Sequence, residues 1–525
     1  MNQDQIKQLE NELWSAADNL RANSKLTAAE YKDPVLGLIL LRYAQNRYEE
    51  AIPLVEAKIP TTPRGKRSAT KADFLAEGAM LLPELSQYDY LANLPESVDI
   101  CEAMNQAMRR IEADYLDLAG VLPKNYHELD AALLRELIRV FNQDSVKNLT
   151  GDIFGRIYEY FLMKFSMSGA GAQEGGEFFT PPSLVQLIVN FIQPNHGIVH
   201  DPACGSGGMF VQTGQFIKDQ NNADSSTINA SIKVYGTELK SNNARLAKMN
   251  LAIHGIEGKI IESNSFYTDP HNLVGQCDFV MANPPFNVNK VDKDRDVVKT
   301  DPRLFKDIGL PKADNGNYLW IQYFYHYLND TGRAGFVMAS SATDAGNSEK
   351  LIRQKLIETG DVDCIVSVGN NFFYTRSLPC HVWFLDKGKT AANKDKILMI
   401  DARNVYRQVT NTLRDFSPEQ MAGLTTILSA YRGEDVSAAF SDNAWLKEAF
   451  PDGHYSDIKG LCKIVSLDEV KDNDYSLTPG RYVGYSVEID HDFDYQARLA
   501  EIHSELAVLN DESGQLMGQI LGRGK

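Results

Sequence analysis

The sequence predicts an α/β fold in which a helical part precedes a nucleotide-binding sheet. Three observations support this class. Between about residues 176 and 400, short apolar runs alternate with helical stretches, as a parallel sheet with crossover helices requires. A glycine-rich turn follows the apolar run Ile198–His200 and leads into a helical stretch that starts at Met209. The next apolar run, Ile232–Gly236, is closely followed by an acidic residue, Glu238.

The strands of the sheet are predicted from apolar runs bounded by glycine or polar residues. In chain order they are Ile198–His200, Ile232–Gly236, Lys259–Glu262, Cys277–Ala282, Ala334–Ala339, Cys364–Val368 and His381–Leu385. We expect a polar loop over Asp219–Ser231 and a mainly helical region from residue 400 to about 485.

The N-terminal part is predicted to consist of packed helices. Leu9, Leu13 and Leu20, followed by the run Leu36–Tyr43, have the spacing of amphipathic helices. The stretch Ser166–Ala172 is rich in glycine, serine and alanine and predicts a flexible junction. The chain is therefore expected to divide into residues 1–165, 166–485 and 486–525.

The turn after the first strand contains residue types that suit a small ligand. Its glycines allow the backbone to approach a ligand without Cβ clashes, and the following helix offers unpaired N–H donors. Asp201 would repel a pyrophosphate but suits an ammonium group, and the spacing is not G-x-G-x-x-G. The predicted ligand contacts in this turn are Asp201, Ala203, Gly205, Ser206, Gly207 and Gly208.

Two further strand ends extend this predicted pocket. Glu238, at the tip of the second strand, is the usual type of partner for a ribose diol. Asn264 and Ser265 follow the third strand, where they are placed to meet an adenine ring. An α/β enzyme that binds another nucleotide is the alternative interpretation of this set.

The most informative motif is Asn283-Pro284-Pro285-Phe286, directly after the strand Cys277–Ala282. The side-chain oxygen of Asn283 and the carbonyl of Pro284 can each accept one N–H of a planar amine. Both prolines lack an N–H and stiffen the loop, so the two acceptors are prepositioned. Phe286 offers a flat face for a base. A proline-stiffened turn with an aromatic plug would give the same four residues.

With the ligand motif before the catalytic motif, the chain resembles S-adenosylmethionine-dependent amino-methyltransferases of DNA. The segment Gly176–Pro181 is similar to one that lies over the cofactor in modification subunits of type I restriction-modification systems. Trp14–Arg21, Tyr31–Asp33 and Leu36–Leu38 are similar to the N-terminal helical domain of those subunits, and Asp474–Tyr482 to the segment before their C-terminal tail. The resemblance thus covers almost the whole chain in the family's order.

This resemblance implies a Rossmann-like S-adenosylmethionine-dependent methyltransferase domain at residues 166–485, with a helical domain before it and a helical tail for partner contact after it. It implies transfer of a methyl group to N6 of adenine in DNA. This chain has Asn264 at a position where members of the family often have an aspartate. The further contacts that the resemblance implies are Glu177, Phe178, Phe179, Thr180, Pro181 and Pro182 on the cofactor, and Phe286 with Phe373 or Tyr374 on the target base.

The resemblance also implies partners. These are a specificity subunit that reads the DNA site, a second copy of the chain and, in restriction complexes, a motor-nuclease subunit. The net charge of −17 would on average repel DNA, so either the substrate is not DNA, or the basic surface is local, or another chain brings the DNA. The resemblance favours the third explanation. One basic cluster, at Arg64, Lys66, Arg67 and Lys71, is either a phosphate contact or a solvated loop.

The composition indicates an ordinary globular protein, with 43% hydrophobic and 23% charged residues. No signal peptide and no apolar run of membrane-spanning length is evident, so we expect a cytoplasmic protein without membrane contact. The six cysteines are scattered without a C-x-x-C pair, which predicts reduced thiols and no metal site.

The last helix carries an apolar stripe at steps of three and four residues, interrupted at Ser513. Its members are Leu499, Ile502, Leu506, Leu509, Leu516 and Ile520. This spacing suits pairing with another helix, or docking on the chain's own domain. Two other functions fit the motifs: methylation of glutamine side chains in proteins, whose carboxamide fits the same acceptors, and a non-catalytic subunit that binds cofactor and organises a complex.

Overall fold

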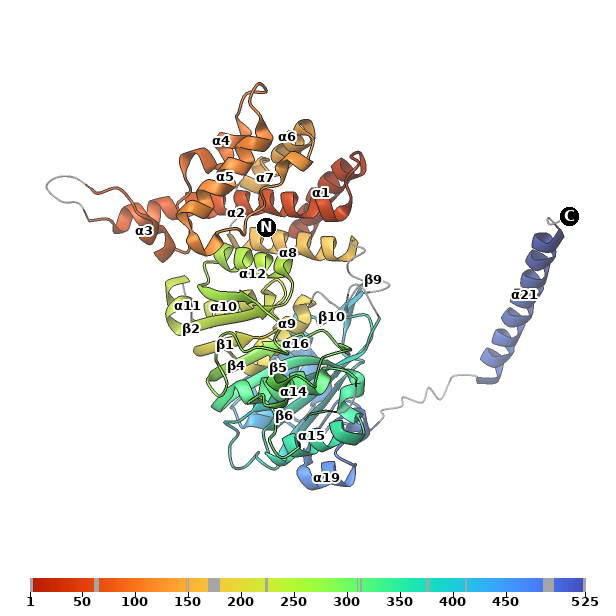
Figure 1. The fold of residues 1–525 in the computed structure, drawn as a ribbon. Helices are drawn as coiled ribbons and strands as arrows, with labels where there is room; N and C mark the ends of the chain where they lie inside the picture. The colour runs from red at the N-terminus through yellow and green to blue at the C-terminus, as the bar shows by residue number, and fades with distance from the viewer. Residues whose placement is uncertain are drawn as a thin grey trace. The chain divides into compact units, whose positions relative to one another are not determined.

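The computed structural model describes residues 3–60, 66–147, 149, 151–168, 180–221, 225–308, 310–311, 314–373, 377–410, 413–484 and 495–522. The chain forms two compact units, Met1–Val483 and Gly484–Lys525. In the first unit, a set of N-terminal helices lies next to an α/β sheet (Figure 1).

The N-terminal helices enclose an apolar core of their own. They are α1 (Gln3–Ala22), α2 (Ala28–Lys58), α3 (Lys71–Ala76), α4 (Tyr88–Ala92), α5 (Ile100–Asp114), α6 (Ala131–Val140), α7 (Asp144–Lys147) and α8 (Gly151–Ser168), with short turns η1 (Glu84–Ser86), η2 (Leu116–Leu118) and η3 (Tyr126–Glu128). Helix α2 begins with a capping box between Thr27 and Glu30. Because helix α8 continues to Ser168, residues 166–168 are helical, which corrects the start of the predicted flexible junction.

Within the described residues, nine strands form one sheet in the order β11-β8-β6-β7-β5-β4-β1-β2-β3. The strands are β1 (Gly197–Asp201), β2 (Ile232–Glu238), β3 (Gly258–Glu262), β4 (Cys277–Ala282), β5 (Leu328–Ala339), β6 (Val362–Val368), β7 (Cys380–Asp386), β8 (Lys396–Ala402) and β11 (Cys462–Ser466). All pairs are parallel except that β7 is antiparallel to β5 and β6, and β11 to β8. The α/β class is confirmed, but the sheet is mixed rather than parallel.

Helices cover both faces of the sheet and form a separate apolar core with each face. One core includes α9 (Pro182–Ile192), α10 (Gly208–Asn221) and α16 (Pro418–Arg432). The other includes α14 (Asn317–Tyr327) and α15 (Asn347–Glu358). Helix α12 (Ser241–Ile253) contributes to two cores, because Leu246, Met249 and Ile253 pack with the N-terminal helices while Ala244 and Ala247 pack against the sheet.

One prediction about an irregular region is wrong. The expected polar loop at Asp219–Ser231 ends in a helix, α11 (Ser225–Ser231). The region after residue 400 contains helices as expected, and it also supplies strand β11 to the sheet and a hairpin of β9 (Arg407–Thr410) and β10 (Leu413–Asp415). The remaining elements are α13 (Asp296–Lys299), η5 (Ser340–Asp344), α17 (Ser437–Asp442), α18 (Ala444–Ala449), α19 (Leu467–Asp472) and α20 (Gly480–Val483).

The second unit contains helix α21 (Tyr495–Gly522). Leu499, Ile502, Leu506, Leu509 and Leu516 of the predicted apolar stripe are exposed on it. Large apolar side chains exposed in a row on one helix are typical of a surface that another helix covers.

Candidate active site

The predicted site residues follow neighbouring strands. Strand β1 pairs with β2 and β4, and β2 pairs with β3, all in parallel. Because parallel strands end at the same edge of a sheet, Asp201, Glu238, Asn264 and Asn283 meet at one edge. The topology therefore brings the predicted cofactor residues and the predicted catalytic loop together.

The glycine turn after β1 is held in a left-handed conformation. Gly205 and Gly207 have φ angles of +53° and +78°, which L side chains rarely adopt. A Cβ at Gly207 would lie 3.4 Å from the Cα of Ala247 in α12, so this side of the turn is closed. A Cβ at Gly205 would meet no heavy atom within 4 Å, so that side of the turn is open.

Glu238 holds this turn in place. Its Oε2 accepts the N–H of Gly205 at 3.0 Å, and its Oε1 accepts the N–H of Lys240 at 2.9 Å. The amide of Cys204 donates to the carbonyl of Thr237 at 3.0 Å.

Asp201 is buried at the start of the turn. Its side chain is 1% exposed, and its Oδ1 accepts the N–H of Ala203 at 2.9 Å. Burial, together with the nearby negative charge of Glu238, raises the pKa of Asp201 well above its usual value. A cation beside Asp201 would favour the ionised carboxylate again.

The turn after β3 supports the glycine turn from the other side. The hydroxyl of Ser265 donates to the carbonyl of Pro202 at 2.6 Å and is buried. The side-chain oxygen of Asn264 accepts the N–H of Phe266 at 3.0 Å. The Ser265 side chain therefore joins two turns, and Asn264 shapes its own turn.

The catalytic loop after β4 places an acceptor in a buried position. The side-chain amide of Asn283 donates to the hydroxyl of Thr180 at 2.9 Å. The side-chain oxygen of Asn283 is buried and has no hydrogen-bond partner among the described residues. Thr180, expected on the cofactor, thus orients Asn283; the two are 103 positions apart, so no local pattern indicates the pairing.

The aromatic residues predicted to contact the base differ in their surroundings. The rings of Phe286 and Phe373 meet edge to face, with centroids 6.2 Å apart. Phe286 is half-buried, Phe373 is 2% exposed, and Phe372 packs in the core against Phe416. The other predicted contacts, Tyr374 and Glu177–Phe179, lie outside the described residues.

A large cleft begins where the catalytic loop ends. Asn287 and Asn317 exchange two hydrogen bonds, of 2.9 Å and 2.8 Å, between the loop and the start of α14. Both residues line a cleft of about 1030 Å³ that extends to the start of α15. The sequence analysis missed this pair, which fixes the turn directly after Phe286.

Two residues of the predicted basic cluster are paired with acids within the helical part. Arg67 makes two hydrogen bonds to Asp73, at 2.6 Å and 2.7 Å, and Lys71 pairs with Asp114 at 2.8 Å. Lys66 donates to a main-chain carbonyl, and Arg64 lies outside the described residues. These contacts favour the structural interpretation of this loop.

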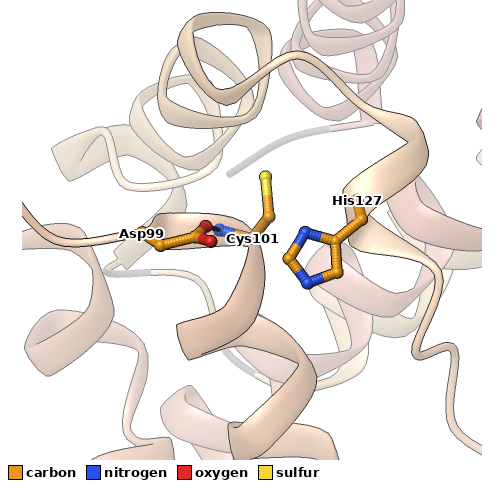
Figure 2. A group of neighbouring side chains, drawn as sticks. All are labelled: Asp99, Cys101 and His127. Atoms are coloured by element: carbon orange, nitrogen blue, oxygen red, sulfur yellow. Dashed lines mark hydrogen bonds between the residues drawn. The ribbon is translucent and has the colours of Figure 1, made fainter.

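All six cysteines are buried free thiols. In the part of the chain that the structure describes, one group of potential metal ligands occurs, at Asp99, Cys101 and His127 (Figure 2). Asp99 already caps α5 by accepting two amide N–H groups, and His127 contacts Glu102 at 3.1 Å. Burial raises the pKa of the Cys101 thiol, which favours the neutral form. This group is separate from the edge that carries the candidate site.

Among the helices described, none combines the length and apolar character needed to cross a bilayer. This finding agrees with the absence of a long apolar run in the sequence.

A glycine turn after β1 and an acid at the tip of β2 are typical of a Rossmann-like sheet that binds a nucleotide cofactor. The family described as N-6 DNA Methylase matches residues 149–491, and the HsdM N-terminal domain matches residues 9–141. The chain therefore belongs to the N-6 DNA methylases, among the methylase subunits of type I restriction enzymes. Members of this family transfer a methyl group to N6 of adenine in DNA.

Individual relatives agree with this assignment. The MjaIX methylase subunit of a type I restriction enzyme from Methanocaldococcus jannaschii is 35% identical, over 98% of this chain and 90% of its own length. The HindI methylase subunit from Haemophilus influenzae is 32% identical, over 84% and 96%. The crystal structure of a type I methyltransferase subunit from Streptococcus thermophilus has the same fold, with a TM-score of 0.70 at 20% identity over 91% of this chain and all of that one.

Proposed function

We propose that Asn283 and the main-chain carbonyl of Pro284 hold the N6 amine of an adenine taken out of the DNA duplex. One observation carries this proposal: the side-chain oxygen of Asn283 is a buried acceptor without a partner among the described residues. Leaving a buried acceptor unsatisfied costs about 1–3 kcal/mol. An N–H of the amine would satisfy it. The hydrogen bond to Thr180 fixes which side of the amide faces the base.

The glycine turn and Glu238 are proposed to bind S-adenosylmethionine. The open side of Gly205 leaves room for a ligand against the backbone, and the carboxylate of Glu238, at the tip of β2, is the usual type of partner for a ribose diol. Asp201 is proposed to face the ammonium of the methionine part, and Asn264 the adenine. The polar residues at this edge of the sheet thus fit a ligand with a cationic end, a diol and a base.

The residues of the chain contribute orientation rather than proton transfer. S-adenosylmethionine supplies the electrophilic methyl group when it is bound. Asn283 and the Pro284 carbonyl draw both N–H groups of the amine to one side, which directs the nitrogen lone pair toward the cofactor side of the loop. The proton is lost from the nitrogen after methylation, when it is more acidic, so we assign no general base.

Phe286 is proposed to stack on the extruded base. The target N6 is paired and stacked inside a duplex, so the adenine must leave it before reaction. Stacking on an aromatic ring contributes roughly 1–3 kcal/mol per base. Because Phe373 meets Phe286 edge to face, we propose that Phe373 fixes the plane of Phe286. Tyr374 is the further candidate for direct contact with the base.

The chain is proposed to act on DNA with a specificity subunit, in a complex that contains a second copy of the chain and, for restriction, a motor-nuclease subunit. The exposed apolar stripe of α21 supports this proposal, because it is a surface for a partner helix. Residues 1–165, 166–485 and 486–525 would then serve as helical domain, methyltransferase domain and partner tail.

Asn283→Ala tests the catalytic proposal. We expect methyl transfer to DNA, measured with labelled cofactor and the specificity subunit, to fall by on the order of 100-fold or more, as when one preorganised transition-state contact is lost. Cofactor affinity should remain nearly unchanged. Asn393→Ala is the matched control, because it also removes a half-buried asparagine hydrogen bond, to Tyr431, far from the catalytic loop along the chain.

Hydrolysis of the labelled product identifies the methylated group and separates the alternatives. Label in N6-methyladenine supports the proposal, and label in glutamine of a protein would contradict it. A wild-type complex without any transfer would indicate a non-catalytic subunit. Equal rates for Asn283→Ala and wild type would remove Asn283 from the catalytic site.

A further inference from the structure

Arg303 is a charged residue buried in the loop between the catalytic motif and α14. Its side chain is 1% exposed. Its Nε and Nη2 donate to the two carboxylate oxygens of Asp301, at 2.9 Å and 2.6 Å. Its guanidinium carbon lies 3.9 Å from the ring centroid of Tyr323 and 5.5 Å from that of Tyr327. This bidentate and stacked geometry is specific to arginine, since lysine offers only a point charge.

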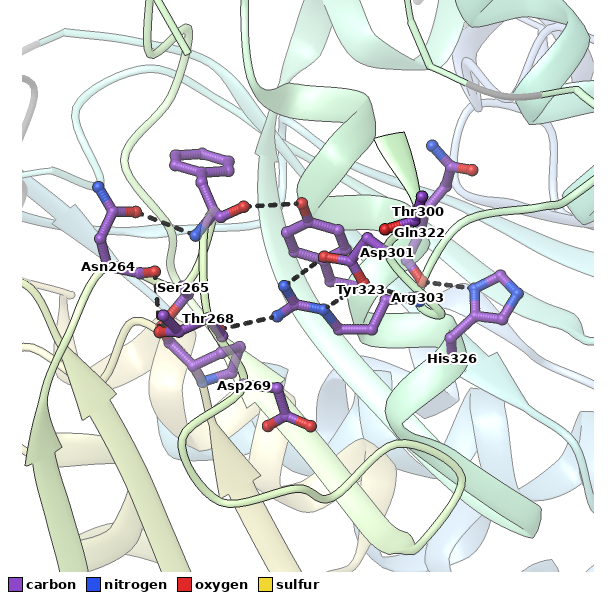
Figure 3. A network of polar contacts seen from close by, with 12 residues as sticks. Asn264, Ser265, Thr268, Asp269, Thr300, Asp301, Arg303, Gln322, Tyr323 and His326 are labelled. Carbon is purple, nitrogen blue, oxygen red and sulfur yellow. Dashed lines mark hydrogen bonds and ion pairs between the residues drawn. The ribbon is translucent and has the colours of Figure 1, made fainter. Parts of the chain in front are cut away.

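The remaining nitrogen of Arg303 connects two segments of the chain. Figure 3 shows Arg303 between Asp301 and Thr268. Nη1 donates to the hydroxyl of Tyr327 at 2.8 Å and to the carbonyl of Thr268 at 3.4 Å. The Tyr327 hydroxyl in turn donates to Asp269 at 3.3 Å. Arg303 therefore joins the last turn of α14 to the turn that follows β3.

The turn after β3 is the one that carries Asn264 and Ser265, proposed to face the cofactor. Helix α14 contacts this turn a second time, through the Tyr323 hydroxyl and the carbonyl of Phe266 at 3.4 Å. The start of the helix is also close, because a Cβ at Gly316 would lie 2.7 Å from the ring of Phe266. The position of this turn thus depends on α14 and on Arg303.

The other end of α14 holds the catalytic loop. Asn317, the first residue of the helix, exchanges two hydrogen bonds with Asn287, the residue after Phe286. One rigid helix is consequently attached to the catalytic loop at its start and, through Arg303, to the cofactor turn at its end. A change at Arg303 would shift the two halves of the site relative to each other.

We propose that Arg303 is a positioning residue for methyl transfer, which sets the place of the cofactor turn relative to the loop that holds the acceptor amine. This inference rests on the proposed function, since it takes Asn264 and Asn283 as the two sides of the reaction. Misplacement of reacting groups by about 1 Å can reduce a rate by on the order of 100-fold. Arg303 itself touches neither reactant.

A purely structural role would give a different result, and the chain offers a matched control. Arg432 of α16 donates to Asp363 of β6 at 2.8 Å and 3.2 Å and to the carbonyl of Phe191 at 2.7 Å. This second arginine–aspartate pair is also buried, with side chains 9% and 1% exposed. Its partners belong neither to the cofactor turn nor to the catalytic loop.

The experiment compares Arg303→Lys with Arg432→Lys in the full chain bound to its specificity subunit. Three quantities are measured: the single-turnover rate of methyl transfer and the cofactor Kd, both below the melting temperature, and the melting temperature itself. We expect Arg303→Lys to lower the rate by about 10- to 100-fold with a smaller change in Kd. Arg432→Lys should leave the rate close to wild type at a comparable loss of melting temperature. Tyr327→Phe is a milder change that removes the hydrogen bond to Asp269, and it should also lower the rate. It replaces Arg303→Lys in the comparison if that variant does not fold.

Three outcomes would overturn the inference. If Arg303→Lys and Tyr327→Phe lose no more rate than the Arg432 control, Arg303 only stabilises the fold. If Asn283→Ala, run in parallel, transfers methyl groups at the wild-type rate, the proposed catalytic loop is wrong and the positioning role falls with it. An inactive Asn283→Ala with a fully active Arg303→Lys would reject the positioning role alone.

Discussion

At the scale of single residues, the site depends on which polar atoms already have partners. Glu238 is fixed by two backbone N–H donors, and the Asn283 amide is fixed by Thr180, so both present oxygens in defined directions. Asp201 differs from these two residues because burial raises its pKa well above the usual value. Its Oδ1 accepts one backbone N–H. Its charge state should therefore respond to what binds beside it.

We predict that cofactor binding releases a proton from Asp201. In the free protein, the raised pKa keeps the carboxyl of Asp201 protonated to a higher pH than usual. The contribution of this protonated carboxyl to the free energy of unfolding is lost as the pH rises through the raised pKa. A bound ammonium lowers the pKa again, so affinity should increase with pH over the same window. Calorimetry in buffers with different ionisation enthalpies measures the released proton.

Asp201→Asn is the control for proton release. It keeps the size of the side chain and an oxygen for the Ala203 amide, but it cannot titrate. Binding to this variant should be weaker and accompanied by no proton release at this position. If wild type and variant show the same proton balance, the ammonium does not lie at Asp201.

At the scale of elements, the turn between β1 and α10 is supported by a helix with two packed faces. Asn250 of α12 donates to the carbonyl of Ser206 at 3.0 Å, while Leu246, Met249 and Ile253 of α12 pack on the N-terminal helices. Arg245 adds a hydrogen bond to the carbonyl of Val121. The N-terminal helices therefore hold the cofactor turn in place through α12.

We predict that Gly205→Ala lowers cofactor affinity more than it lowers stability. Gly205 has a φ of +53°, so an alanine there should cost about 1–2 kcal/mol of strain. Its Cβ would enter the open side of the turn, and we expect cofactor binding to weaken by a further 1–3 kcal/mol, roughly the cost of overfilling a packed site. Isothermal titration and thermal unfolding measure the two effects separately.

Gly433→Ala provides the matched control, because Gly433 ends α16 with a φ of +85° and its Cβ would also meet no atom within 4 Å. It should lose stability to a similar extent and bind the cofactor normally. Equal cofactor affinity in both variants would place the ligand away from the Gly205 side of the turn.

The sequence predicted β1 to β4 to within about two residues at either end, because each is an apolar run bounded by polar or glycine residues. The direction of β7 was not predictable, because all of its residues are buried. A strand that is buried on both faces has the same apolar pattern whether it runs parallel or antiparallel to its neighbours. The four loop residues from Asn283 to Phe286 were predictable as a motif. The contacts of Thr180, Asn317 and Arg303 were not, because they join segments far apart in the sequence.

At the scale of the whole molecule, charge and partnership are linked. The chain has a net charge of −17, and the described cations of its one basic cluster already have partners within the helical part. Of these cations, Arg67 and Lys71 are paired with acids and are thus less available to phosphates. Because each neutralised phosphate requires a local cation, the positive surface that binds DNA should come largely from another subunit.

We predict that this chain alone binds duplex DNA weakly and without sequence preference, and that removal of the residues after about 490 abolishes assembly with the specificity subunit. The truncation removes α21, whose exposed Leu499, Ile502, Leu506 and Leu509 form the proposed seam, while the site edge in the first unit is retained. Co-purification measures assembly, and calorimetry should show normal cofactor binding by the truncated chain.

A gentler variant separates the seam from the loss of a whole segment. Leu506→Asp with Leu509→Asp places charges in the stripe and should weaken assembly, because a buried unpaired carboxylate is costly at a helix interface. Val508→Asp tests an exposed position on another side of the helix, outside the stripe, and should assemble more nearly like wild type. If the truncated chain still assembles and methylates normally, α21 docks on its own chain instead. If the full chain alone methylates one DNA site tightly and specifically, the requirement for a separate specificity subunit is wrong.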